Sequence, residues 1–188
     1  MGSVTELSEL GVAEVAEALR AGDVTAERLA DALLARAAAN AHLNAFITLD
    51  PGQVRAAARA ADQRRLSGAA LGPLHGVPLA LKDNLDTADL PTTGGTPGLK
   101  SNRPAHDAAV VEKLRAAGAI VMGKCNMHEL AYGITSNNAA FGPVRNPYAP
   151  ARIPGGSSGG TAAAVAARLA PGGIGTDTGG SVRVPAAL

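Results

Sequence analysis

The chain has 188 residues, with 17 Lys and Arg against 16 Asp and Glu, so its formal net charge is +1. This balance excludes the strong electrostatic attraction to nucleic acid or to an anionic membrane that basic proteins show. With 46% hydrophobic and 18% charged residues, the composition is that of a globular protein. The absence of Trp and the presence of only two Tyr and two Phe leave little surface for base stacking.

The cysteine content and the N-terminus exclude further classes of protein. Cys125 is the one cysteine, which excludes an intrachain disulfide and a cysteine-based zinc cluster. Glu6 and Glu9 stand where a signal peptide carries basic residues, and no stretch approaches the roughly 18 apolar residues of a membrane helix. We therefore expect a cytoplasmic protein that contacts neither membrane nor nucleic acid.

Residues 1–70 form a predicted N-terminal helical region. Apolar residues at helical spacing over 12–19 predict a helix that stops at Gly22. Two further helices are expected over about 25–40 and 51–68. These segments contain no recognisable chemistry, and we interpret them as a scaffold.

Residues 71–188 alternate between strand and helix patterns and are expected to join the helical region in one domain. Strands are expected over 77–82, 119–122 and 172–176, with helices over 107–117, capped by Asp107 and burying Val110, Val111, Leu114 and Ala117, and over 160–169. Strands separated by long crossovers indicate parallel pairing. The predicted fold class is α/β, with a mixed, mainly parallel sheet flanked by helices.

Two sequence matches to known motifs are rejected on physical grounds. Residues 118–125 come within one residue of a phosphate-binding loop, but 119–122 read as an apolar strand and Cys125 replaces the magnesium-binding hydroxyl. Residues 156–160 match the nucleophile elbow of α/β-hydrolases, but residues 151–154 do not predict the strand that this motif requires. Every histidine also lies upstream of Ser158, whereas that fold places its histidine downstream.

The strongest signal is the dense glycine between residues 155 and 180, which indicates close backbone approach or unusual dihedral angles. A helix after Ser157 would carry the chain about 12–15 Å away, and the following strand would return it a similar distance, bringing Ser181 beside Ser157. Lys82 ends its own strand, and the carboxyl ends of parallel strands share one edge of a sheet. Two serines and a lysine can therefore meet without a histidine.

This set can perform nucleophilic catalysis. A neutral lysine can deprotonate a serine hydroxyl, which requires a pKa lowered by about three units from about 10.4, or about 4 kcal/mol. Burial of Lys82 against apolar neighbours is the available cause. The backbone amides of residues 178–181 can turn toward one point as an oxyanion hole, in which each donor contributes about 3–4 kcal/mol. Taken singly, such a serine is usually a turn residue and such a lysine a solvated surface group.

Other polar residues receive a structural interpretation. Asp177 and Arg183 are expected to form an ion pair that ties their loop together. His75 and His128 are interpreted as structural residues or as supports of the site. No metal or organic cofactor is expected.

Three stretches of the sequence resemble a known family. Residues 74–84, 153–160 and 175–185 are similar to the amidase signature family, closely from about residue 72 onward and more loosely over the N-terminal helices. In that family a Ser-cisSer-Lys triad hydrolyses amide bonds. The resemblance implies the following roles: Ser181 as nucleophile, Ser157 as bridging serine after a cis peptide bond, Lys82 as base, Ser158 as auxiliary serine, and the amides of Thr178, Gly179, Gly180 and Ser181 as oxyanion donors.

Within the family, residues 128–138 and 183–185 look most like indoleacetamide or mandelamide hydrolases, which act on linear amides. The alternative is the A subunit of the glutamyl-tRNA amidotransferase, which commonly has Gln where this chain has Val184. The expected substrate is thus a small-molecule amide. The sequence leaves open whether the protein forms a homodimer. Cys125 replaces a common Thr and is not interpreted as catalytic.

Length is the main departure from the family, whose members are more than twice as long. The resemblance therefore implies the N-terminal portion of such an enzyme, without much of the substrate pocket. A second hypothesis, of a different class, is an inactive fragment with at most a structural role.

Overall fold

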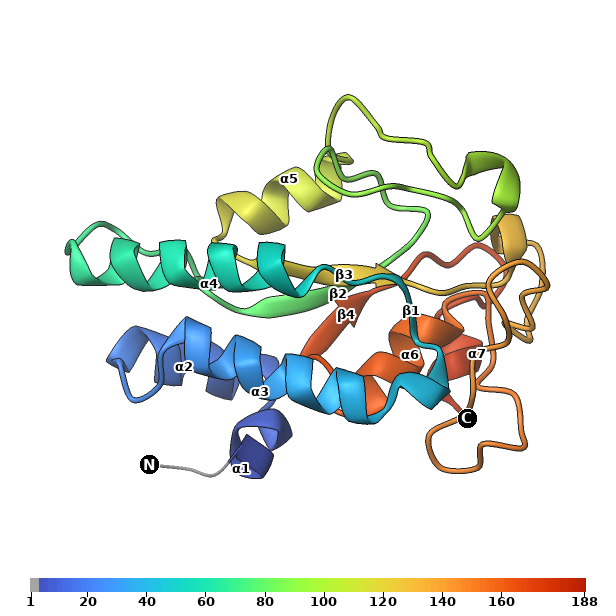
Figure 1. Ribbon diagram of the computed structural model, residues 1–188, viewed down its shortest axis with the longest axis horizontal. Coiled ribbons are helices and arrows are strands. Elements are labelled where there is room, and N and C mark those ends of the chain that lie inside the picture. Colours follow the sequence, from blue (N-terminus) through green and yellow to red (C-terminus); the bar gives the residue numbers. More distant parts are fainter. Residues whose placement is uncertain (1–3) are drawn as a thin grey trace.

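The computed structural model describes residues 4–188, so Met1 to Ser3 of the predicted helical region lie outside it (Figure 1). The N-terminal part forms α1 (Val4–Glu9), α2 (Val12–Ala21), α3 (Ala26–Ala39) and α4 (Pro51–Leu66), with a 3-10 turn η1 (Ala41–Leu43). The three predicted helices are confirmed as α2 to α4, and α1 is an additional short helix. Gly22 ends α2 in a left-handed conformation, with φ of 82°. The Thr25 hydroxyl caps α3 by accepting from the Arg28 amide at 3.2 Å.

A four-stranded sheet follows the order β1-β3-β2-β4. Its strands are β1 (Phe46–Thr48), β2 (Pro78–Lys82), β3 (Ile120–Cys125) and β4 (Gly172–Ile174). The central β2 pairs in parallel with both β3 and β4, whereas β1 runs antiparallel to β3. The mixed, mainly parallel sheet is confirmed. β3 continues through Lys124 to Cys125, which supports the rejection of a phosphate-binding loop there.

The remaining helices are α5 (Ala109–Ala116), α6 (Gly159–Ala166) and α7 (Arg183–Ala186), with 3-10 turns η2 (Pro97–Leu99) and η3 (Glu129–Ala131). α6 ends three residues before the predicted limit, and β4 ends two residues early. The prediction of a helix and of a strand is confirmed at both places.

Two details predicted for α5 are wrong. Ala108, not Asp107, occupies the N-cap position, because the Asp107 carboxylate instead accepts from the Ala88 amide at 2.8 Å and pairs with Arg115 at 2.8 Å. Val110 is 37% exposed, since α5 turns Val111 toward the sheet and Val110 away from it.

Two apolar clusters cover the sheet. The larger one joins the N-terminal helices and α6 to residues of β2 and β3, and so contains side chains from both halves of the chain. A smaller cluster of Leu81, Leu85 and Val111 packs α5. Figure 1 shows α5 and α6 on opposite sides of the strands. The carboxyl ends of β2, β3 and β4 consequently emerge between two helix layers.

Over residues 4–188, the structure contains no helix with the length and apolarity that a bilayer crossing requires.

Candidate active site

Lys82 is the last residue of β2, and its side chain is fully buried. Its Nζ donates to the Ser157 Oγ at 2.6 Å, to the Thr176 Oγ1 at 2.8 Å and to the Thr176 carbonyl at 3.3 Å. The central position of β2 explains this meeting, because the segments after β3 and β4 reach the strand end from either side. The solvated surface lysine considered from sequence is thereby excluded.

Burial changes the acid–base behaviour of this amine. Loss of hydration lowers the pKa of Lys82 from 10.5 to about 8, while the charge of Asp177 acts in the opposite direction. With this pKa, about a tenth of the amine is neutral at pH 7 and about half at pH 8, and the neutral form is the one that a base requires.

Ser157 lies in the loop that leads into α6 and is also fully buried. The Gly156–Ser157 peptide bond is cis, as the family resemblance implies. The Ser157 carbonyl accepts from the His128 amide at 3.1 Å, which ties this loop to the segment after β3. No strand lies directly before Ser157 in the described chain, so the nucleophile elbow does not apply.

Ser181 returns to the same place from the far side of α6 and β4. The Ser158 amide donates to the Ser181 carbonyl at 3.1 Å, and the Ser158 hydroxyl donates to the Thr176 carbonyl at 3.3 Å. Ser181 is half-buried, whereas Ser157 is enclosed. The predicted chain reversal is thus present, and the more accessible of the two serines is the one expected to meet a substrate.

The loop after Thr176 is organised by Asp177. Its carboxylate accepts from the amides of Gly180 at 2.7 Å, Val182 at 3.0 Å and Arg183 at 3.1 Å, and from the Arg183 guanidinium at 3.0 and 3.1 Å. These contacts, that of the guanidinium first, hold the pKa of Asp177 well below its usual range. The expected ion pair is present.

The same loop provides the candidate oxyanion donors. The Gly180 amide is directed at Asp177, so it is already occupied. The amides of Thr178, Gly179 and Ser181 have no acceptor among the described residues. Thr178 and Gly179 are exposed, and these three N–H groups are free to meet a ligand.

Thr176 and Asn84 are site residues that reasoning from the sequence missed. Thr176 Oγ1 accepts from both Lys82 and Asn84, the latter at 3.0 Å. A signal existed, because Thr176 is the last residue of the strand predicted over 172–176, and the carboxyl ends of parallel strands share one sheet edge with Lys82.

The glycine density has a steric explanation. A Cβ on Gly160 would overlap the Asn126 carbonyl, and one on Gly159 would overlap the Ser136 hydroxyl. Ser136 is fully buried, has a positive φ of 52° and accepts from the Gly159 amide at 3.1 Å. The start of α6 is therefore pressed against neighbouring backbone, which keeps Ser157 and Ser158 in place.

Three other reactive side chains stay outside this arrangement. Cys125 is completely buried, and burial raises its pKa to about 12, so its thiol stays protonated. His75 Nε2 lies 3.1 Å from the Ala61 carbonyl, and His128 Nδ1 lies 3.2 Å from the Thr135 hydroxyl. Both histidines have structural contacts. Within residues 4–188, His, Cys, Asp and Glu form no group of three or more that could hold a metal ion.

A mainly apolar cavity of about 330 Å³ adjoins the site. Its lining includes Ser158, Thr161, Val165, Val182, Pro185 and Leu188. Ser158 thus connects the polar cluster to a space large enough for a small apolar group.

Comparisons of the sequence and of the structure with known proteins all point to amidase-type proteins. The amidase family model matches residues 28–188. The A subunit of the glutamyl-tRNA(Gln) amidotransferase of Chloroflexus aurantiacus is 51% identical over 98% of this chain and 38% of its own length. The protein of the same name from Halorhodospira halophila is 52% identical over 94% of this chain and 37% of its own. The peptide amidase of Stenotrophomonas maltophilia superposes with a TM-score of 0.90 at 42% identity, over 95% of this chain and 38% of that one. The chain thus spans less than two-fifths of the length of these relatives.

Proposed function

The chain belongs to the amidase family, whose members act on carbon–nitrogen bonds, and on this premise we propose that its site hydrolyses a carboxylic acid amide through a seryl acyl-enzyme. The products are the acid and ammonia or an amine. The observation that supports this proposal most directly is the buried Lys82 amine, 2.6 Å from the Ser157 hydroxyl.

The proposed reaction begins with a proton relay. Neutral Lys82 accepts the proton of Ser157, which in turn accepts the proton of Ser181, and the Ser181 Oγ attacks the amide carbon. The amides of Thr178, Gly179 and Ser181 stabilise the oxyanion, and that of Gly180 joins them if it releases Asp177. The relay then runs in reverse and protonates the leaving nitrogen as the C–N bond breaks. Water, deprotonated by the same relay, hydrolyses the ester and restores Ser181.

The finer choice of substrate has two candidates. An arylacetamide-like amide is favoured by the apolar Val184, whose Cγ2 would lie 3.2 Å from a Cβ on Gly180 and so close to the oxyanion loop. The glutaminase of a glutamyl-tRNA(Gln) amidotransferase is favoured by the 51% identity to the A subunit of that enzyme. We place the arylacetamide first because Val184 has no group that could hydrogen-bond to a glutamine.

The test uses the purified 188-residue chain. A fluorophosphonate probe should label wild type at Ser181, located by peptide mass spectrometry, and should not label Ser181→Ala. Ser67→Ala, at the end of α4, serves as the matched control and should label as wild type does. Ammonia release is then measured for phenylacetamide, indoleacetamide and glutamine. Absence of labelling in the wild type would support the inactive fragment instead.

A further inference from the structure

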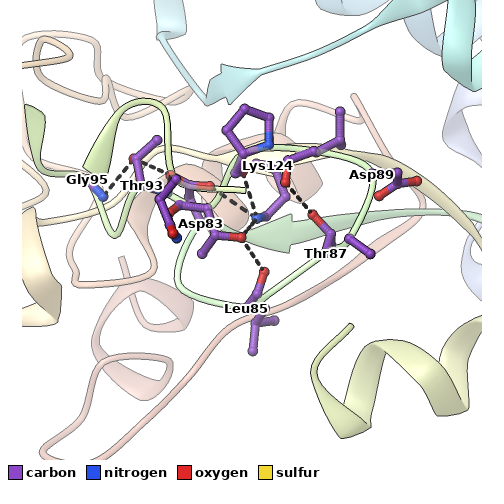
Figure 2. Close-up of polar contacts among 12 residues, drawn as sticks. Asp83, Leu85, Thr87, Asp89, Thr93, Gly95 and Lys124 are labelled. Atoms are coloured by element: carbon purple, nitrogen blue, oxygen red, sulfur yellow. Dashed lines mark hydrogen bonds and ion pairs between the residues drawn. The ribbon is translucent and has the colours of Figure 1, made fainter. Parts of the chain in front are cut away.

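A buried ion pair lies directly beside the site, and the reaction described above does not use it. Asp83 and Lys124 are both fully buried, with 3.3 Å between the Asp83 Oδ1 and the Lys124 Nζ. Asp83 follows Lys82 in the chain. Lys124 belongs to the neighbouring strand β3, where it lies beside Leu81 of β2. Figure 2 shows the two side chains pointing toward one another among residues of the segment that follows β2.

The pair fastens that segment to the ends of two strands. Lys124 Nζ donates to the Thr92 hydroxyl at 2.7 Å and to the Pro91 carbonyl at 3.1 Å. The Asp83 carboxylate accepts from the Thr93 amide at 3.0 Å and from the Thr93 hydroxyl. Residues 91–93 are therefore held both by Asp83, directly after β2, and by Lys124 in β3.

The backbone of Asp83 is fixed as firmly as its side chain. Its amide donates to the Cys125 carbonyl at 3.1 Å, and its carbonyl accepts from the Gly94 amide at 2.9 Å. In the register of β2 against β3, Leu81 lies beside Lys124 and Lys82 lies beside Cys125, so the side chains of Lys82 and Lys124 point to opposite faces of the sheet. Asp83, in the turn directly after Lys82, reaches Lys124 on one face, while Lys82 reaches Ser157 on the other. The orientation of the Lys82 amine is thus coupled to that of the Asp83 carboxylate.

Stability alone is a poor reason for such a pair. Two charges removed from water lose much of their hydration, and a well-packed apolar pair is often equally stable. Loss of one partner is different, because it leaves a buried charge without compensation. The Asp83–Lys124 pair therefore has one strongly preferred orientation, and it lies one residue away from the base.

We propose that Asp83 and Lys124 are positioning residues for Lys82, which hold the end of β2 so that the amine meets Ser157 and Thr176. This inference rests on the proposed function. It assigns no contact with substrate to either residue.

The experiment compares Lys124→Met with the neutral double variant Asp83→Asn/Lys124→Met and with Leu33→Ala. Leu33 is a buried residue of α3, and its truncation lowers stability without touching the site. Two quantities are measured on folded protein, namely the rate of fluorophosphonate labelling at Ser181 and the ¹⁵Nζ signal of Lys82. The signal is assigned by its loss in Lys82→Met.

We expect Lys124→Met to slow labelling about 100-fold, the effect of a displacement of about 1 Å, and to move the Lys82 signal. The double variant should recover to within about tenfold of wild type, because the amide oxygen introduced at position 83 can still accept from Thr93. Leu33→Ala should change neither quantity. If Lys124→Met does not fold, Thr93→Val replaces it, since it removes one hydroxyl contact and should slow labelling about tenfold.

Wild-type labelling and an unmoved Lys82 signal in Lys124→Met or Thr93→Val would overturn the positioning role. An equal effect of Leu33→Ala would overturn it as well, because the cause would then be general loss of stability. Failure of the proposed function looks different, since the wild type itself would not label, and the positioning role would fall with it.

Discussion

Lys82 and Ser157 are 75 residues apart in the sequence and 2.6 Å apart in the structure, between Nζ and Oγ. Both side chains are fully buried, so this contact is shielded from bulk solvent. The amine reaches the serine from the end of a central strand, and the serine is held by a loop packed against backbone. A relay of protons needs this rigidity, because each partner must stay within hydrogen-bond distance of the next.

Replacement of the proposed base gives the first prediction. Lys82→Ala should slow fluorophosphonate labelling of Ser181 by at least about 100-fold, the lower range for loss of a general base. Lys100→Ala is the matched control, because Lys100 is exposed at the end of η2. A Lys82→Ala variant that labels at the wild-type rate would remove Lys82 from the mechanism.

The pKa of Lys82 predicts a pH profile. Because the neutral amine is the reactive form, the labelling rate should rise with pH through about 8 and level off above it. Stability should depend on pH in the same region. The pKa in the folded protein lies below 10.5, so between about pH 8 and 10.5 the unfolded chain binds more protons and this residue's contribution to stability grows. Below pH 8 the amine is charged in the folded and the unfolded state, so the full desolvation cost of the buried charge lowers the free energy of unfolding. A labelling rate that is flat from pH 6 to 10 would contradict the prediction that neutral Lys82 is the reactive form.

Asp177 should influence that profile. Its negative charge raises the pKa of Lys82, so Asp177→Asn should move the inflection of the labelling rate to lower pH. The variant should also loosen the loop, because the carboxylate accepts from three backbone amides and the Arg183 guanidinium. Arg183→Gln is the control, since it weakens the ion pair and leaves the carboxylate charged. An inflection that shifts equally in both variants would assign the effect to the loop and not to the charge.

Gly160 offers a steric prediction. Alanine is ordinarily better than glycine inside a helix by about 1 kcal/mol. Here the added methyl would overlap the Asn126 carbonyl, so Gly160→Ala should instead lower the free energy of unfolding by about 1–3 kcal/mol. Gly98→Ala is the matched control, because a Cβ there meets no atom within 4 Å and the change should stay within about 0.5 kcal/mol. Urea unfolding of both variants measures the difference, and equal stabilities would refute the steric account.

Cys125 should be chemically silent. With a pKa of about 12 and no exposed surface, its thiol should react with an aromatic disulfide reagent at pH 8 only after unfolding. Reaction is followed by absorbance with and without urea, with free cysteine as the reference for an exposed thiol. Rapid reaction of the folded protein would show that β3 opens far more readily than its packing implies.

Local patterns in the sequence were sufficient for most elements. Helical periodicity over 12–19 with Gly22 as its stop, and Thr25 as a cap, predicted α2 and α3 because these signals act within a few residues. β1 was missed, since three residues contain no period. The cap of α5 was misassigned because Asp107 has a distant partner in Ala88, which local sequence does not reveal.

For the site, the ends of parallel strands and one chain reversal predicted from the sequence that Lys82, Ser157 and Ser181 lie close together. The structure brings Lys82 to Ser157 and the Ser181 backbone to Ser158, and the catalytic roles of the three residues stay predictions. The tertiary structure alone decided their environment. It placed Thr176 and Asn84 around the amine, directed the Gly180 amide toward Asp177 and buried the Asp83–Lys124 pair one residue from the base. The physical reason is that the positions and ends of helices and strands follow from local patterns, whereas strand order, burial and hydrogen-bond partners depend on contacts between segments far apart in the chain.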